Sequence, residues 1–228
     1  MTGYQEVISD PSYKNQIITF TYPHIGNVGV NNDDQESNSS YVSGIVLSEI
    51  PTNSSNWRST KDFSSYLIDK KIVCIADLDT RYIASLIRNK GAMSACIIHD
   101  KKNIKEAKEK LENFSGIYGA ELASKVSAKK NYSFNEKIFQ YEEKISKPGK
   151  TFKVVAYDFG VKKNILRILS SMNCNLEVVP AKTTSDKILS LKPDGIFLSN
   201  GPGDPEPCDF AIKSIKDLFD YNIPIFGI

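Results

Sequence analysis

Short apolar runs alternate with amphipathic segments along the second half of the chain. Four runs have the length and composition of buried strands, at residues 154–157, 176–180, 195–198 and 223–226. Between them, apolar residues recur at helical spacing around residues 165–169, 185–191 and 210–219. The side chains expected to face inward are Ile165, Leu166, Ile168 and Leu169 in the first helix and Ile212, Ile215, Leu218 and Phe219 in the last. Because strands that alternate with helices are joined by right-handed crossovers, the pattern predicts a parallel sheet covered on both faces.

The first half of the chain is less regular and predicts a mixed α and β domain. Strands are expected at residues 17–21, 41–47, 72–76 and 95–98, and helices at 62–67, 80–90 and 104–114. The continuous apolar run at 72–76 is typical of a strand buried on both faces. The helix at 80–90 is expected to begin with a cap at Asp79 and Thr80 and to end at Gly91. An alternative is that Asp79, Thr80 and Arg81 form a catalytic cluster of acid and base. Residues 115–139 carry little pattern.

The division into domains is expected at a polar segment rich in charge. Residues 141–151 include Pro148 and Gly149. After this segment the spacing of hydrophobic residues along the chain changes. We therefore expect an N-terminal domain at 1–140, a linker at 141–151 and a second domain at 152–228.

Composition excludes several classes of protein. Of the 228 residues, 40% are hydrophobic and 25% charged, and the formal net charge of +2 gives no reason to expect nucleic-acid binding. No apolar run approaches the roughly 20 residues that span a bilayer, and the first residues do not resemble a signal peptide, so we expect a cytosolic protein without a membrane partner. The cysteines are far apart and are expected to be free thiols, buried at Cys74 and Cys96 rather than metal ligands; the others are Cys174 and Cys208.

A glycine-proline turn follows the third strand of the second half. Gly201 and Gly203 lack a Cβ and permit close approach to the main chain, and the prolines at 202 and 205 stiffen the turn. Together with Gly160 and Gly227, these glycines fall at the carboxyl ends of the predicted parallel strands, where ligands bind in such sheets. The turn is therefore either an anion-binding or oxyanion loop, or an ordinary connection from strand to helix.

Several stretches resemble a known family. Residues 154–167 and 194–205 resemble the start of a class I glutamine amidotransferase domain. Residues 1–6, 10–13, 22–27 and 75–81 resemble the small chain of glutamine-hydrolysing carbamoyl-phosphate synthase. The resemblance implies an α/β architecture, with a mixed N-terminal small-chain domain followed by an incomplete amidotransferase domain whose parallel sheet is flanked by helices.

The resemblance also implies a chemistry. In this family a cysteine thiolate, activated by a histidine and a glutamate, attacks the side-chain amide of glutamine and releases ammonia. By position, Ser12, Gly201 and Gly203 are expected to bind L-glutamine, with the glycine loop contributing to the oxyanion hole. The implied partner is a large chain that uses ATP, Mg and bicarbonate to make carbamoyl phosphate for arginine and pyrimidine biosynthesis, whereas this chain carries no cofactor or metal.

The sequence departs from the family at its catalytic residues. The nucleophile is expected on a tight elbow of G-x-C-x-G type, and the chain stops at Gly227-Ile228, where that elbow begins. Neither His24 nor His99 matches the catalytic histidine, and no cysteine matches the nucleophile. We therefore expect a fragment that lacks both termini, contains no catalytic residue and is inactive alone. The alternatives are another class I amidotransferase, a partner-docking module without catalysis, or the product of a decayed gene.

Overall fold

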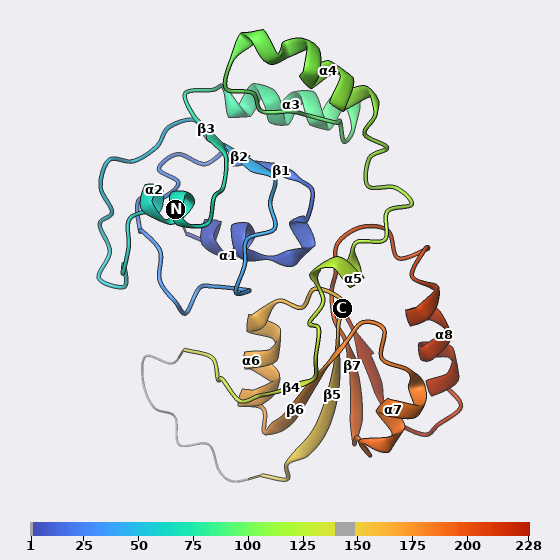
Figure 1. The fold of residues 1–228 in the computed structure, drawn as a ribbon. Helices are drawn as coiled ribbons and strands as arrows, with labels where there is room; N and C mark the ends of the chain where they lie inside the picture. The colour runs from blue at the N-terminus through green and yellow to red at the C-terminus, as the bar shows by residue number, and fades with distance from the viewer. Residues whose placement is uncertain (1, 140–148) are drawn as a thin grey trace. The chain divides into compact units, whose positions relative to one another are not determined.

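The computed structural model describes residues 2–139 and 149–228, and the chain forms two compact units (Figure 1). Unit 1 comprises Met1–Ser9 and Tyr13–Tyr118, and unit 2 comprises Asp10–Ser12 and Gly119–Ile228. The division falls after Tyr118, ahead of the linker expected from the sequence, and residues 141–148 of that linker lie outside the described part. The expected domain limits stay a prediction.

Unit 1 is built on a small parallel sheet. Its three strands lie in the order β1-β2-β3, with Ile18 opposite Ile45 and Ile45 opposite Cys74. Its elements are α1 (Tyr4–Ser9), β1 (Ile17–Thr19), β2 (Gly44–Val46), α2 (Phe63–Asp69), β3 (Cys74–Ile75), α3 (Thr80–Lys90), a 3-10 turn (Lys101–Asn103) and α4 (Ile104–Glu112). A second 3-10 turn, η1 (Pro11–Tyr13), lies where the chain passes between the units.

The core of unit 1 joins α1 and α2 to the central strand. Tyr4 and Phe63 are buried with ring centroids 5.0 Å apart in an edge-to-face arrangement, beside the fully buried Ile45. Aromatic pairs in this geometry contribute about 0.5–1.5 kcal/mol beyond the area they bury. The interior of unit 1 is therefore fixed by residues from both its first helix and its second.

The predicted cap of α3 is present. The Asp79 carboxylate accepts a hydrogen bond from the Tyr82 amide at 2.9 Å, and the helix ends at Gly91 with a φ of +81°. A carboxylate in this position satisfies an N–H that has no partner within the helix. The cap interpretation is confirmed, since the carboxylate is held by the helix it begins.

Unit 2 contains the expected parallel sheet. Strand order is β4-β6-β5-β7-β8, with β4 antiparallel and the other neighbours parallel. Its elements are α5 (Ala123–Val126), β4 (Tyr132–Phe134), β5 (Phe152–Asp158), α6 (Lys163–Ser171), β6 (Cys174–Pro180), α7 (Ser185–Ser190), β7 (Gly195–Leu198), α8 (Asp209–Leu218) and β8 (Ile225–Gly227). Strand β7 has the predicted bounds, whereas α5 and β4 come from the segment that showed little pattern.

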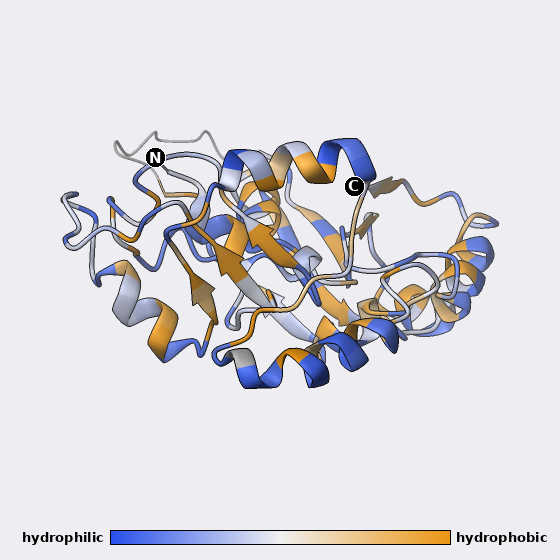
Figure 2. Ribbon diagram, turned by 90° about the horizontal axis from the view of Figure 1, so that it is seen from above, coloured by the Kyte–Doolittle hydropathy of each residue, from blue (hydrophilic) through white to orange (hydrophobic). Residues whose placement is uncertain are grey.

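Helices cover this sheet on both faces, as predicted. Alternate residues of β5 point to opposite sides: Val155 packs with Ile188 of α7 and Leu218 of α8. On the other side Ala156 packs with Leu166 of α6. Figure 2 shows strands that are hydrophobic along most of their length and helices that carry both hydrophobic and hydrophilic residues. A parallel sheet needs this cover because both of its faces are apolar.

Two strand predictions for unit 1 are wrong. Residues 95–98 form no strand, and of these only Ile97 is partly buried. The run 72–76 forms only the two-residue β3, whose neighbour Val73 is 50% exposed, because β3 lies at the edge of the sheet rather than within it. The expected burial of two cysteines also fails, since Cys96 is exposed and Cys74 half-buried.

In the second half of the chain, three side chains predicted to face inward do not. Ile168, Ile212 and Phe219 are exposed by 41%, 38% and 67%. Helix α8 instead buries Ala211 and Ser214 with Leu218. Small side chains let the helix axis approach its neighbours, which apolar spacing alone does not reveal. Within the described part of the chain, no helix is both long and apolar enough to cross a membrane.

Candidate functional site

The candidate site lies at the carboxyl ends of β5 and β7 in unit 2. Asp158, the last residue of β5, is buried and accepts three backbone hydrogen bonds. Its Oδ1 accepts from the amides of Gly160 and Val161, each at 2.9 Å, and its Oδ2 accepts from the Ala128 amide at 2.7 Å. A buried carboxylate with this many donors holds the following loop in one conformation.

Gly160 is required by the shape of this loop. It has a φ of +117°, which disfavours any residue with a Cβ. A Cβ here would also lie 2.8 Å from Val126 Cγ2 and 3.0 Å from Pro202 Cδ. The glycine therefore lets the loop after β5 pack directly against the glycine-proline loop after β7.

Asn200 connects the two loops. Its Oδ1 accepts a hydrogen bond from the Lys162 amide at 3.2 Å, and its Nδ2 donates to the Gly160 carbonyl at 3.1 Å. The same Nδ2 donates to Ser12 Oγ at 2.7 Å. One amide side chain thus joins both loops and a residue from near the start of the sequence.

Ser12 reaches the site because the segment Asp10–Ser12 belongs to unit 2. Asp10 is 5% exposed, and its Oδ1 accepts the Ser12 amide at 2.8 Å. Its Oδ2 lies 3.5 Å from Lys162 Nζ. An ion pair and a backbone hydrogen bond therefore hold Ser12 beside Asn200, next to the loop that contains Gly201 and Gly203.

The two loop glycines are required for different reasons. Gly203 has a φ of +84° and pairs with Glu121 in an isolated antiparallel bridge, where a Cβ would collide with the Ala120 carbonyl oxygen. Gly201 has an ordinary φ, but a Cβ there would collide with the Phe159 carbonyl oxygen. Close packing against neighbouring backbone thus excludes larger residues at both positions. Binding of glutamine by either glycine remains a prediction.

Asp204 holds the end of the glycine-proline loop that follows Gly203. Its Oδ1 accepts the Glu206 amide at 3.0 Å and its Oδ2 accepts the Gly119 amide at 2.9 Å. These hydrogen bonds favour the carboxylate and lower the pKa of Asp204 below its usual value. The Asp204 carboxylate therefore fixes the end of the glycine-proline turn, while Asp158 fixes the neighbouring loop after β5.

Cys208 follows the loop but is a poor nucleophile. Its side chain is buried, and its Sγ lies 3.7 Å from the Asp204 carbonyl oxygen. Burial raises the pKa of the thiol, and the carboxylates of Glu121, Asp204 and Asp209 raise it further. Because the thiolate is the reactive form, these surroundings suppress its reactivity.

The histidines and the remaining cysteines show no catalytic arrangement. His24 Nδ1 lies 2.8 Å from a carboxylate oxygen of Glu49 on the surface of unit 1, and His99 is also exposed there. Burial raises the pKa of Cys74 to about 11, and it raises the pKa of Cys174 as well. Among the described residues, no group of three or more His, Cys, Asp or Glu side chains could hold a metal ion.

The structure brings Ser12 and the glycine loop together, as the sequence analysis required of a shared site. Sequence reasoning assigned no role to three of the residues that connect them, which are Asp158, Lys162 and Asn200. Asn200 lies inside the glycine-proline motif, so a search for polar side chains between the glycines and the strand would have found it.

The comparisons with known proteins show what the chain is similar to. Residues 1–97 match the carbamoyl-phosphate synthase small chain, CPSase domain, and residues 155–228 match glutamine amidotransferase class-I. The carbamoyl phosphate synthase small chain of Buchnera aphidicola (subsp. Acyrthosiphon pisum) is 49% identical over 233 residues, covering 100% of this chain and 60% of the relative. Those of Salmonella typhimurium and Escherichia coli K12 are each 48% identical, again over 100% of this chain and 61% of the relative. The chain therefore spans about 60% of the length of these curated relatives.

Proposed function

We propose, from the premise that the chain is a homologue of carbamoyl phosphate synthase small chains along its whole length, that it forms part of a glutaminase subunit. The subunit would hydrolyse L-glutamine and pass ammonia to a large chain. That partner would make carbamoyl phosphate from bicarbonate with ATP and Mg, for arginine and pyrimidine biosynthesis. A cytosolic location belongs to the same proposal.

One observation carries the proposal: Asn200 holds Ser12 beside the glycine loop. Its Nδ2 donates to both Ser12 Oγ and the Gly160 carbonyl. The family resemblance assigns Ser12 and the loop glycines to one substrate, although they lie far apart in sequence. Their meeting within unit 2 is what a single glutamine site requires.

The proposed roles follow from the chemistry of each group. Backbone N–H groups of Gly201 and Gly203 would stabilise negative charge on the glutamine side-chain carbonyl during attack. The Ser12 hydroxyl would hydrogen-bond a polar group of the bound amino acid. Asp158 and Asn200 would act indirectly, by holding the loops that carry these groups in place.

We propose that residues 1–228 bind glutamine without hydrolysing it. The family resemblance places the nucleophile on an elbow after β8, and none of the four cysteines lies there. The thiol of Cys208 is buried and has a raised pKa, which suppresses its reactivity. Ammonia release by the chain alone would contradict this part of the proposal.

The match over residues 1–97 favours this function over that of another class I amidotransferase. Such an enzyme would account for residues 155–228 alone. A docking module without a substrate is the remaining alternative, and it predicts no binding of glutamine.

Isothermal titration calorimetry with L-glutamine distinguishes these functions. We expect saturable binding by residues 1–228, weakened in Ser12→Ala and absent with D-glutamine, and no ammonia in a coupled assay. Titration should extend to about 10 mM, above the usual range of KM values. A correctly folded chain that shows no binding of L-glutamine would support the docking module instead.

A further inference from the structure

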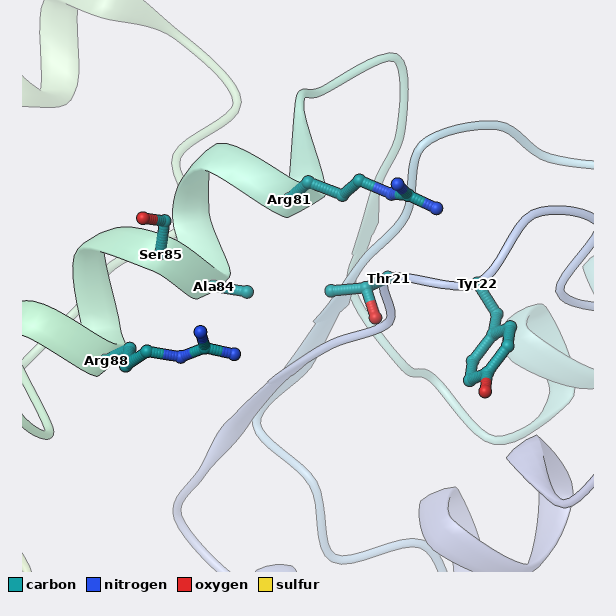
Figure 3. Close-up of a pocket in the computed structure, with 6 residues that line it drawn as sticks. All are labelled: Thr21, Tyr22, Arg81, Ala84, Ser85 and Arg88. Atoms are coloured by element: carbon teal, nitrogen blue, oxygen red, sulfur yellow. The ribbon is translucent and has the colours of Figure 1, made fainter.

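A hollow in unit 1 gathers two arginines that the proposed function does not use. It measures about 460 Å³ and lies between α3 and the segment that follows β1. Its lining residues are Thr21, Tyr22, Arg81, Ala84, Ser85 and Arg88 (Figure 3). A hollow of this volume is within the range of sites for small molecules.

The arginines share one face of α3. Arg81, Ala84 and Arg88 are three and four residues apart, so their side chains leave the helix on the same side. Figure 3 shows both guanidinium groups extending toward the segment that carries Thr21 and Tyr22. The small side chain of Ala84 lies between them and leaves the floor of the hollow open, whereas the Ser85 hydroxyl points away.

The distribution of arginine in the chain is selective. Only four of the 29 basic residues are arginines. Two of these have ion-pair partners, since Arg58 contacts Asp33 and Asp34, and Arg167 contacts Glu136. Among the described residues, neither Arg81 nor Arg88 has a carboxylate within 4.0 Å, so both remain available to a ligand.

The helix that lines the hollow is basic. Helix α3 contains no acidic residue, and Lys90 carries a third positive charge in addition to those of Arg81 and Arg88. The preceding Asp79 is engaged in capping the helix. A guanidinium presents several fixed N–H donors that match phosphate oxygens, which makes arginine better suited than lysine to bind a phosphate.

We propose that this hollow binds a small phosphorylated molecule. Arg81 and Arg88 contact the phosphate oxygens, and the Thr21 hydroxyl supplies a further donor. The Tyr22 ring, 63% exposed at the rim, packs against the part of the ligand that carries the phosphate. The site lies in unit 1 and is independent of the proposed glutamine site, whose residues all belong to unit 2.

The test is a titration of the whole chain with ribose 5-phosphate, followed by nuclear magnetic resonance of the arginine side chains and backbone amides. Inorganic phosphate tests the charged group alone, and unphosphorylated ribose tests the remainder. Arg81→Gln and Arg88→Gln each remove a guanidinium from an exposed position, so the fold should survive. Lys90→Gln is the matched control, because it removes the same charge from the same helix outside the hollow.

We expect saturable shifts at Arg81, Arg88 and Thr21 with ribose 5-phosphate, weaker ones with phosphate and none with ribose. Each arginine variant should weaken binding about tenfold, the effect of losing one charge-assisted hydrogen bond, while the Lys90 variant changes it less than twofold. An equal loss in Lys90→Gln would show diffuse charge attraction and overturn the site. Binding of an acidic peptide in preference to both phosphates, with the same dependence on the arginines, would also overturn it in favour of a protein partner.

Discussion

Asn200 Nδ2 donates a 2.7 Å hydrogen bond to Ser12 Oγ, although the two residues are 188 positions apart. The same amide group binds the loop after β5 through the Gly160 carbonyl and the Lys162 amide. The relationship explains why Asp10–Ser12 belongs to unit 2 rather than to the unit that surrounds it in sequence. It also predicts that a substitution at Asn200 loosens the segment that contains Ser12.

The substitution Asn200→Asp should loosen both loops of the candidate site. An aspartate is similar in size, but it places an oxygen against the Gly160 carbonyl where the amide now donates. Amide hydrogen exchange by mass spectrometry should speed up by about tenfold in peptides that cover residues 10–12 and 159–162, from the loss of roughly 1–2 kcal/mol. Peptides of unit 1 that exclude this segment serve as the internal control. Unchanged exchange at residues 10–12 would show that Asn200 does not hold them.

Gly203→Ala should destabilise unit 2 more than Gly119→Ala. Both glycines have positive φ, +84° and +70°, so each alanine incurs backbone strain of about 1 kcal/mol. A Cβ at Gly119 meets nothing within 4 Å, whereas one at Gly203 collides with the Ala120 carbonyl. The additional cost at Gly203 should therefore be about 1–3 kcal/mol, measured as faster exchange across β7 or a lower melting temperature. Equal effects would mean that the loop can move away from Ala120.

Asp158→Asn should destabilise the loop after β5. The carboxylate accepts three backbone hydrogen bonds, and an asparagine turns one acceptor into a donor that faces an N–H group. A cost of about 2–3 kcal/mol is expected from hydrogen bonds to a charged group. Asp186→Asn removes the same charge from an exposed position in α7 and should change stability by less than about 0.5 kcal/mol. Similar losses in both variants would point to net charge rather than to the hydrogen bonds.

The four thiols should react with iodoacetamide in an order set by their environments. Cys96 is exposed and should be alkylated first. Burial raises the pKa of Cys74 to about 11, and burial and nearby carboxylates raise that of Cys208, so at pH 8 both remain largely protonated. Mass spectrometry of peptides at timed intervals measures the four rates. Rapid labelling of Cys208 would contradict the buried position given to it here.

Much of unit 2 could be predicted from the sequence because its pattern reflects burial on two faces. β7 lies at the predicted residues, and the order of strands and helices gave the parallel sheet. The run at 95–98 has the same composition as a strand yet remains unpaired, since composition does not supply a neighbouring strand. In α8, the buried face is set by the small residues Ala211 and Ser214, which a search for large apolar side chains overlooks.

The candidate site also has residues that could be predicted from the sequence and residues that could not. Gly201 and Gly203 were recognisable because glycines that alternate with prolines mark a turn, and the structure shows the close backbone contacts that exclude a Cβ. The interactions of Asn200 and Asp158 could not be predicted from local sequence, because they depend on segments that meet only in the folded unit. Ser12 was identified through family resemblance, and its contact with Asn200 supplies the physical link.

The central claim is that Ser12 and the glycine loop form one glutamine site through Asn200. A double-mutant cycle tests it most directly, with L-glutamine affinity measured by calorimetry for the original chain, Ser12→Ala, Asn200→Ala and the double variant. If Asn200 acts by positioning Ser12, the double variant should bind about as weakly as the weaker single variant, with a coupling energy of about 1 kcal/mol. Losses that simply add would contradict the account, because they would mean that the two residues act on glutamine independently.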